Sequence, residues 1–239
     1  DITTALKKVY DIERLVGKIS YGNANARDMI SLKNSLRQLP ELKSVLARTK
    51  TELLQNLYLN LDILEDVHQL IEESIVEEPP LTITDGGIIK LGYNEEADKY
   101  KKAMTAGKNW LIQLEAKEKE ETGIKNLKVG FNKVFGYYIE VSKSNVNLVP
   151  ERYIRKQTLT TGERFITDEL KQLESDILGA EEKVVKLEYD IFIEIRNKIA
   201  SQIERIQKSA NIVSTIDVLA SFATVADDLG YVKPIVDDS

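Results

Sequence analysis

The chain has 239 residues, of which 42% are hydrophobic and 30% are charged, and its formal net charge is −6. This apolar content is enough for a sizeable core and argues against a disordered chain. The chain has no cysteine, which excludes disulfide bonds and thiolate metal sites, and we expect a reducing, cytoplasmic setting. The single histidine, His68, excludes His-cluster metal sites, so we expect no metal and no His-based catalysis.

No apolar run approaches about 20 residues, so we expect no membrane-spanning segment. We also expect no signal peptide. The chain begins at Asp1 rather than Met and ends shortly after Lys233-Pro234. We therefore expect both ends to lie inside a longer protein.

The N-terminal part has apolar residues at helical spacing, which predicts a helix over residues 2–16. Gly22-Asn23 breaks the pattern. A second helix is predicted over 25–38, with a stop near Pro40. Residues 41–47 predict a further short helix.

A third long helix is predicted from Leu53 to about Ile75, where apolar residues step by four and three. His68 lies on this apolar seam. We expect it to be a partnered residue at the core edge, because no second His or Cys is present to share a metal. After Glu77-Glu78-Pro79-Pro80, residues 81–91 carry Asp-Gly-Gly turn chemistry and predict a small hairpin or an extended link.

Two long helices with heptad seams are predicted next, over 94–121 and 168–208. Asn94 is the expected N-cap of the first, and Gly123 is expected to end it. In the second, the steps change to four near Ile195, which predicts a local relaxation of the supercoil. At about 1.5 Å per residue the helices are roughly 40 and 60 Å long, and together they predict an antiparallel coiled-coil arm. The seam residues are Ala97, Tyr100, Met104, Gly107, Leu111 and Leu114, then Leu170, Leu173, Ile177, Ala180, Val184, Leu187 and Ile191.

A final helix is predicted over about 209–229. Its apolar face is expected to pack back onto the helical base. The residues of that face are Ile212, Ile216, Leu219, Phe222, Ala223 and Ala226.

Between the two heptad seams lies a basic, strand-like segment, residues 124–167. Eight Lys or Arg and three Glu give it a charge of +5, while the other residues sum to 25 minus 36, or −11. A positive segment on an acidic chain indicates a polyanionic partner, with nucleic acid the leading candidate. The cations are Lys125, Lys128, Lys133, Lys143, Arg152, Arg155, Lys156 and Arg164.

The basic segment predicts four strands, over 127–131, 135–141, 153–159 and 163–166. Two hairpins in one antiparallel sheet are expected to place both tight turns at the same end. Cations, hydroxyls, an amide and a glycine N–H at these turns suit DNA phosphates, and no recognition helix is present. We therefore expect sequence-independent, salt-sensitive binding, at the weak end of roughly 10⁻⁴–10⁻⁶ M. The expected contacts are Asn132, Lys133, Lys143, Arg155, Lys156, Thr160, Thr161, Gly162 and Arg164.

Other interpretations of the same residues stay open. Basic residues on a small sheet are often only a solvated face. Arg152 and Arg164 can instead pair with Glu151 and Glu163. Tyr137 and Tyr138 are expected to point to opposite faces of the sheet, with one of them in the core and the other available to stack on a base.

Several segments strongly resemble the clamp region of the bacterial MutS family of DNA mismatch repair proteins. They read VGFNKVFGYYIEV from Val129, VPERYIRKQTL from Val149 and GERFITDEL from Gly162. Shorter matches at DGGII, GYNEE, LGAE and IDVLA extend the resemblance over the whole chain. At Thr161-Gly162 the family commonly has Asn-Ala at its clamp tip, so the side-chain contacts of the tip are left open. At Ala97 the family usually has Leu, so this chain has a smaller residue in the helix seam.

The resemblance implies a mainly α fold, in which a helical core or lever domain is interrupted by an inserted clamp. We expect residues 1–93 and 209–239 to form the core. Residues 94–208 are expected to form the coiled-coil arm and clamp, with a four-stranded antiparallel β module over 124–167. In that family the clamp closes over duplex DNA and touches its backbone without reading sequence.

Other properties of the family are not expected in this chain. The ATP site needs a G-x-x-x-x-G-K-[ST] loop, which is absent, so ATP and magnesium belong to the longer protein. Phe192-Ile193-Glu194 matches the family's mismatch-reading Phe-x-Glu motif, but it lies within a predicted helix and is treated as a coincidence. Family dimerisation relies on the ATPase domain, so this chain is expected to be monomeric and the longer protein a homodimer.

The leading hypothesis is a non-enzymatic part of a mismatch repair ATPase, whose stiff helices carry motion to a clamp that holds double-stranded DNA. The alternative is a structural coiled-coil module of a MutS-like paralogue that binds protein and not DNA. Basic residues that face the acidic helices rather than solvent would favour the alternative. A hydrolytic enzyme is disfavoured, because clustered acids such as Glu118, Glu120 and Glu121 have the spacing of helix-surface charge pairs.

Overall fold

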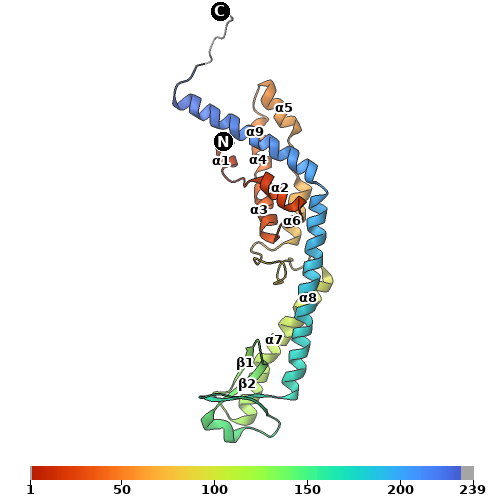
Figure 1. Cartoon of the computed structure of the whole chain (residues 1–239), viewed down its shortest axis with the longest axis vertical. Coiled ribbons are helices and arrows are strands. Elements are labelled where there is room, and N and C mark those ends of the chain that lie inside the picture. Colours follow the sequence, from red (N-terminus) through yellow and green to blue (C-terminus); the bar gives the residue numbers. More distant parts are fainter. Residues whose placement is uncertain (1, 233–239) are drawn as a thin grey trace, which may run out of the picture. The chain divides into compact units, whose positions relative to one another are not determined.

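The computed structural model describes residues 2–232, which form two compact units (Figure 1). The first unit takes in the residues up to Tyr93 and those from Glu188 onward, and the second unit is Asn94–Leu187. One helix, α8 (Asp168–Ala200), supplies residues to both units. Asp1 and Lys233-Pro234, on which the expectation about the chain ends rests, lie outside the described residues. The predicted fold class, mainly α with a small antiparallel sheet, is confirmed.

The first unit is built from helices that share one apolar core. The predicted helix over 2–16 is in fact two, because residues 7–11 leave the helix. The N–H of Tyr10 donates to Ser35 Oγ at 2.9 Å, and Asp11 caps the second helix by accepting from the N–H of Arg14 at 2.9 Å. The helices are α1 (Ile2–Leu6), α2 (Ile12–Ser20), α3 (Ala26–Leu36), α4 (Leu39–Leu46), α5 (Glu52–Asn60), α6 (Glu65–Ser74) and α9 (Ile203–Asp228).

Two predicted boundaries in this unit are corrected by the structure. Pro40 lies in the first turn of α4 instead of stopping a helix, since its missing N–H is not needed there. The predicted helix over 53–75 breaks at Leu61–Leu64. Leu64 has φ of 55°, and its N–H is held by Asp62 Oδ1 at 2.9 Å.

Contacts from distant residues hold this break. Arg205 of α9 binds Asp62 at 2.9 Å and Asp66 at 2.7 Å, and Ser209 donates to the carbonyl of Asp62 at 2.8 Å. The hydrogen bond and charge of Arg205 hold the pKa of Asp66 below its usual value. Tertiary contacts therefore override the helical periodicity of the sequence.

His68 lies half-buried on α6, at the core edge as expected, but the expected partner is not found at Nε2 among the described residues. This atom has no hydrogen-bond partner among residues 2–232. Burial, followed by the nearby charge of Arg37, lowers the pKa of His68, so the imidazole is neutral at pH 7. No group of three or more His, Asp and Glu side chains in the described part of the chain could hold a metal ion.

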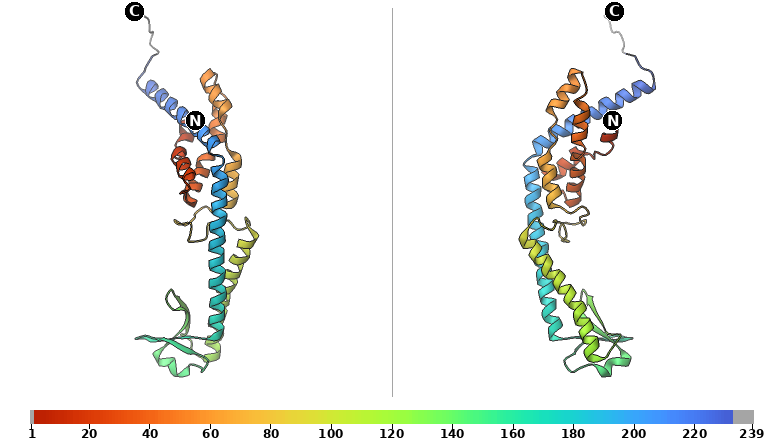
Figure 2. Two further views of the ribbon diagram at one scale, coloured as in Figure 1. Left: turned by 45° about the vertical axis from the view of Figure 1, so that its right-hand side comes forward. Right: turned by 180° about the vertical axis from the view of Figure 1, so that it is seen from behind.

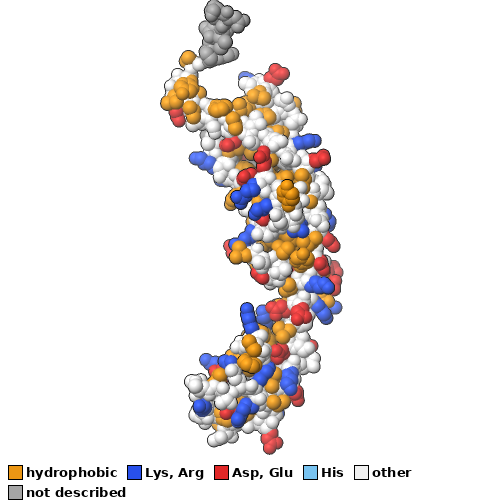
Figure 3. All heavy atoms as spheres, viewed as in Figure 1, with side chains coloured by type: hydrophobic (Ala, Val, Ile, Leu, Met, Phe, Trp, Pro, Cys, Tyr) orange, Lys and Arg blue, Asp and Glu red, His pale blue; other side chains and the backbone are white. Residues whose placement is uncertain are grey.

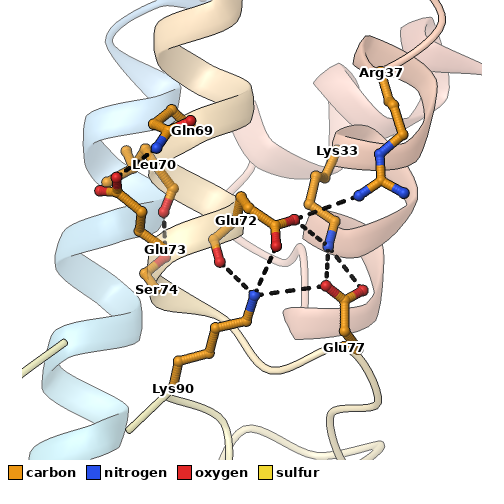
Figure 4. A network of polar contacts seen from close by, with 9 residues as sticks. All are labelled: Lys33, Arg37, Gln69, Leu70, Glu72, Glu73, Ser74, Glu77 and Lys90. Atoms are coloured by element: carbon orange, nitrogen blue, oxygen red, sulfur yellow. Dashed lines mark hydrogen bonds and ion pairs between the residues drawn. The ribbon is translucent and has the colours of Figure 1, made fainter. Parts of the chain in front are cut away.

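A buried lysine joins α3, α6 and the segment after α6 (Figure 4). Lys33 is fully buried, and its Nζ lies 2.9 Å from Glu72 and 2.7 Å from Glu77. Lys90 reaches the same two carboxylates at 3.0 and 3.5 Å. Hydrogen bonds from Lys33 and then Lys90 lower the pKa of Glu72 to about 2, and Lys33 also lowers that of Glu77. The network fixes the start of the segment that follows α6.

The segment between α6 and the second unit is an irregular loop with turns and bends over residues 81–86, so neither the predicted small hairpin nor an extended link is formed there. A single antiparallel bridge joins Ile75 to Ile89. The N–H of Ile88 donates to the buried carboxylate of Glu188 at 3.1 Å. The loop is therefore tied to the part of α8 that belongs to the first unit.

The predicted helix over 168–208 ends early, at Ala200, and α9 begins at Ile203. At the break, Ser201 Oγ donates to the carbonyl of Lys198 at 2.7 Å, and the N–H of Gln202 bonds the carbonyl of Ile199 at 2.9 Å. These short-range bonds close the last turn in place of the helical pattern.

The second half of α9 does not pack as predicted. Ile206, Val213 and Ile216 are buried, but Phe222 is 69% exposed and Ala223 is exposed. In Figure 2 the blue end of α9 projects beyond the red and orange helices of the same unit. By length and composition α9 could cross a membrane, with a mean hydropathy of 1.4, but a buried core helix passes the same test. The buried residues of α9 lie in its first half, and the helix packs against α2, but only 22% of the apolar stretch is buried.

In the second unit, α7 (Glu95–Thr122) runs antiparallel to the start of α8. Contacts that pair Tyr100 with Lys183 and Lys117 with Glu169 give this direction. The predicted caps are confirmed: Asn94 Oδ1 accepts from the N–H of Ala97 at 2.9 Å, and Gly123 has φ of 72°. The predicted seam residues of both helices are buried or half-buried as far as Leu187. The sequence therefore identified this helix pair correctly.

The two helices approach closely at Gly107. A Cβ there would lie 2.5 Å from Cγ1 and 3.0 Å from Cδ1 of Ile177. We predict that Gly107→Ala destabilises the second unit by about 1–2 kcal/mol, since the overlap outweighs the gain of about 1 kcal/mol in helix propensity. In the Ile177→Ala background the same change should instead stabilise by about 1 kcal/mol. Urea unfolding followed by Trp110 fluorescence measures both; the same sign in both backgrounds would rule out the overlap.

A four-stranded antiparallel sheet completes the second unit. Its strands are β1 (Lys128–Asn132), β2 (Gly136–Ser142), β3 (Ile154–Thr158) and β4 (Gly162–Ile166), with a short 3₁₀ helix η1 (Lys143–Leu148) after β2. The spatial order is β1-β2-β4-β3. One face of the sheet packs on α7 and α8 through Ile139, Val141 and Phe165, which are buried with seam residues of both helices.

Candidate nucleic-acid interface

The strand order separates the two tight turns, so the prediction that they share one edge is wrong. Gly136, next to the first turn, begins β2, whereas Ser142 at the other end of β2 pairs with Gly162, next to the second turn. The turns share an end only if β2 neighbours β3, but β2 pairs with β4. At about 3.3 Å per residue the two ends of β2, called here the Gly136 end and the Ser142 end, are about 20 Å apart.

The Gly136 end holds three of the nine predicted contacts. Asn132 Oδ1 accepts from the N–H groups of Val134 and Phe135 at 2.8 and 3.3 Å, so its carbonyl shapes the turn. Lys133 is exposed and has no ion pair within residues 2–232. Lys156 donates to the carbonyl of Phe135. This end therefore offers one unengaged cation beside exposed apolar side chains.

The Ser142 end holds Lys143, Thr160, Thr161 and Gly162. Lys143, Thr160 and Thr161 are exposed, and the N–H of Lys143 donates to the carbonyl of Thr161 at 3.2 Å. The start of η1 and the second turn are thereby held together. Lys143 has no ion pair in the described part of the chain, so its charge faces solvent.

A polar network at the Ser142 end was missed by the sequence reasoning. Asn126 donates to Ser142 Oγ at 3.0 Å and accepts from Asn145 at 2.8 Å, and the hydroxyls of Ser142 and Ser144 lie 3.1 Å apart. These side chains come from three segments. The run of Lys, Ser and Asn over 142–147 was the available signal. Lys125 stands beside this network, exposed and without an ion pair among the described residues.

Packing between strands requires a glycine at position 162. It is buried between strands, and a Cβ there would lie 2.4 Å from the carbonyl oxygen of Val141. The predicted role, a glycine N–H open to phosphate, therefore competes with a packing requirement. Only glycine lets β2 and β4 approach this closely.

The three arginines of the basic segment are paired with carboxylates. Arg155 lies 2.7 Å from Glu163, and Arg164 lies 2.9 Å from Glu140. The proposed pairs of Arg152 with Glu151 and of Arg164 with Glu163 are not formed: Arg152 binds two acids of α7, Glu118 and Glu121. These arginines therefore add little free positive charge.

Arg152, which precedes β3, helps to attach the sheet to α7. Tyr153 donates to the buried Glu118 Oε2 at 2.7 Å, and Arg152 donates to the same oxygen at 2.6 Å. Burial, with the bond to Glu118, raises the pKa of the Tyr153 phenol. A second tie runs from the N–H of Val129 to Glu115 at 2.9 Å. The start of β3 and β1 are thus both fixed to α7.

The two adjacent tyrosines point to opposite faces, as predicted. Tyr137 packs against Phe131 with ring centroids 4.8 Å apart, beside the buried core. Tyr138 lies on the other face, covering Gly130, with the Arg164 guanidinium 4.0 Å above its ring. In this arrangement Tyr138 is engaged by an arginine and is not a free platform for a base.

The surface view agrees with this distribution. Blue Lys and Arg side chains lie across the sheet region in Figure 3, interspersed with a few acidic ones. Exposed lysines supply the unengaged charge, and the network at Asn126 and Ser142 supplies donors and acceptors. The Ser142 end therefore combines the groups that bind phosphate oxygens.

Comparison with known proteins agrees with the resemblance seen in the sequence. Residues 92–183 match the model for MutS family domain IV. The chain is 59% identical over 231 residues, 97% of its length, to the DNA mismatch repair protein MutS of Ruminiclostridium cellulolyticum, and 55% identical over 237 residues, 99% of its length, to that of Caldanaerobacter subterraneus. It spans 26% and 27% of these relatives, about a quarter of their length. This chain belongs to the MutS family.

Proposed function

We propose that this chain is a DNA-holding part of a mismatch repair protein, and that its second unit contacts the backbone of duplex DNA without reading sequence. The names of the relatives support the process. The observation that carries the contact is the Ser142 end, where exposed Lys125 and Lys143 flank an ordered network of Asn and Ser side chains. Such a surface suits phosphates rather than base edges.

The proposal ranks the predicted contacts. Lys143, Thr160 and Thr161 are assigned to the main contact, joined by Lys125 and Asn126. Asn132, Lys133 and Lys156 lie at the other end of β2 and are assigned a minor role. Arg155 and Arg164 are neutralised by Glu163 and Glu140, so they position the sheet rather than attract DNA.

Two matched double variants test this ranking. Lys125→Ala/Lys143→Ala and Lys133→Ala/Lys156→Ala each remove two charges, from the Ser142 end and the Gly136 end. Each phosphate contact contributes about 0.9 to the slope of log K against log salt. The variant Lys125→Ala/Lys143→Ala should reduce the magnitude of this slope by about 2 and weaken binding. The variant Lys133→Ala/Lys156→Ala should change the slope little. Fluorescence anisotropy with a labelled duplex over a salt series measures both.

The outcomes separate the possible surfaces. If only the double variant at the Gly136 end strongly weakened DNA binding, the main contact would lie at that end and the ranking would be wrong. If wild type and both doubles gave the same weak slope, the alternative function would be favoured, a coiled-coil module with no DNA contact of its own. The pairing of Arg152 with acids of α7 is the observation that supports that alternative.

We further propose that the chain transmits motion in a longer, ATP-dependent protein. Support comes from α8, a single helix that supplies residues to both units. ATP, magnesium and the homodimer contact are assigned to parts of the longer protein outside this chain, which spans about a quarter of its relatives. The proposed location is the cytoplasm, consistent with the absence of cysteine.

A further inference from the structure

The second unit carries an apolar groove on a side of α7 and α8 where α7 has mainly small residues. Ala103, Ala106 and Gly107 form one wall, and Trp110, half-buried, stands at its end. Leu173 of α8 lines the opposite wall, and the groove holds about 660 Å³. A surface this apolar is a site where another apolar group can be covered.

The charge around the groove is one-sided. Glu169 and Asp176 of α8 line it, and no Lys or Arg among the described residues does. Glu169 is partly offset by Lys117 at 3.4 Å, while Asp176 is bonded only by the neutral Gln172 at 3.2 Å among the contacts described. An occupant with apolar side chains and a nearby cation therefore complements this groove.

The same unit exposes a segment with that chemistry. The tip of the β1–β2 hairpin carries Val134, which is 81% exposed, and Phe135, which is 39% exposed. Lys133 precedes them, without an ion pair in the part of the chain that the structure describes. Two bulky apolar groups and a cation at a solvent-exposed turn indicate an interaction site more than a solvated loop.

The tip and the groove lie at the same level of α8. A Cβ on Gly136, the residue after the tip, would lie 1.7 Å from Glu174 Oε1, and the groove is lined by Leu173 and Asp176. In a twofold dimer, each surface must meet its complement in the other copy at the same time. The tip and the groove lie beside the same part of α8. When the helix pairs of two copies cross at that part, each tip can therefore meet the groove of the other copy.

We infer that the groove receives the β1–β2 tip of a second copy of this chain. Val134 and Phe135 of one copy cover Trp110 and the small residues of the other, and Lys133 meets Asp176. The interface is reciprocal and small, so the association is weak and transient. It involves only the second unit and is distinct from the dimer contact assigned to the longer protein.

Sedimentation velocity of the whole 239-residue chain, from about 1 µM to about 1 mM, tests the inference. A dimer should form with rising concentration, together with a blue shift of Trp110, the only tryptophan. Val134→Asp should raise the dissociation constant at least about tenfold. Leu148→Asp is the matched control, since Leu148 is 57% exposed on η1 outside the proposed contact; it should leave association unchanged.

A charge exchange tests the pairing itself. Lys133→Glu and Asp176→Lys should each weaken association several-fold, and the double variant should recover most of the loss. A monomer at all concentrations overturns the inference. So does equal loss in Val134→Asp and Leu148→Asp, or a double variant that is no better than the singles. Circular dichroism of each variant confirms that the exposed substitutions leave the fold intact.

Discussion

Replacing Lys33 with alanine is expected to lower the free energy of unfolding of the first unit by about 2–4 kcal/mol. The side chain is fully buried, so its loss leaves a cavity as well as an unmade ion pair. The carboxylates of Glu72 and Glu77 are 35% and 57% exposed, so water can solvate them once Lys33 is gone. Because water solvates these carboxylates, the expected loss of stability is smaller than for an unpaired charge that is fully buried. Urea unfolding followed by far-UV circular dichroism measures the effect.

Lys33→Met separates packing from charge, because it keeps most of the volume. Its loss of stability should be smaller than that of Lys33→Ala. The Trp110 fluorescence transition reports on the second unit and provides an internal control, since Trp110 lies outside the first unit. Equal losses in the alanine and methionine variants would mean that the ion pairs, and not the cavity, dominate.

The same network predicts a pH dependence. The folded pKa of Glu72 is lowered from 4.5 to about 2, with Lys33 as the largest cause. A lowered carboxyl pKa contributes stability above pH 4.5 that is lost as pH falls toward 2. Wild-type stability should therefore decline over that range, and Lys33→Met should decline less steeply. Identical pH profiles for the two proteins would exclude Lys33 as the cause.

Local signals explain what the sequence could predict. The capping side chain of Asn94 marks the start of α7, and the backbone freedom of Gly123 marks its end. The heptad pattern places Leu111 and Ile177 in the seam. These features need only neighbouring residues or a repeated spacing. The helix pair, the four strands and the basic segment are accordingly predictable from the sequence.

The missed features depend on residues far apart in the chain. The break at Leu61–Leu64 is held by Arg205, more than 140 residues later than Asp62. From the sequence alone Lys33 is predicted to be a surface lysine, because its partners Glu72 and Glu77 lie far from it in the chain. Helical periodicity carries no information on such partners, so a continuous helix is predicted where tertiary contacts impose a break.

Part of the candidate site could not be predicted from the sequence for the same reason. Two hairpins can be recognised from turn residues, but their order in the sheet depends on which strands pair. β2 pairs with β4, and this choice moves Lys133 and Thr161 to opposite ends of the sheet. The network of Asn126 and Ser142 then arises from segments that no local pattern connects.

Gly162→Ala is expected to destabilise the second unit by about 2–3 kcal/mol, because the added Cβ meets backbone that cannot move alone. It would lie 2.4 Å from the Val141 carbonyl oxygen and 3.3 Å from Cα of Ser142. Relief requires β2 and β4, the two central strands, to separate at the Ser142 end, on the same ladder that holds the buried pair Ile139 and Phe165. Urea unfolding followed by Trp110 fluorescence measures the loss.

Gly130→Ala is the matched control on β1 of the same sheet. Its Cβ would lie 2.8 Å from atoms of the Tyr138 ring, and a side chain can turn aside where a strand cannot. Its cost should be smaller, and its DNA affinity should stay near that of the wild type. Gly162→Ala should weaken DNA binding in step with the displacement of Thr161 and Lys143. Equal stability of the two variants would show that β2 and β4 do not need a glycine here, and would return Gly162 to the role of an open phosphate donor.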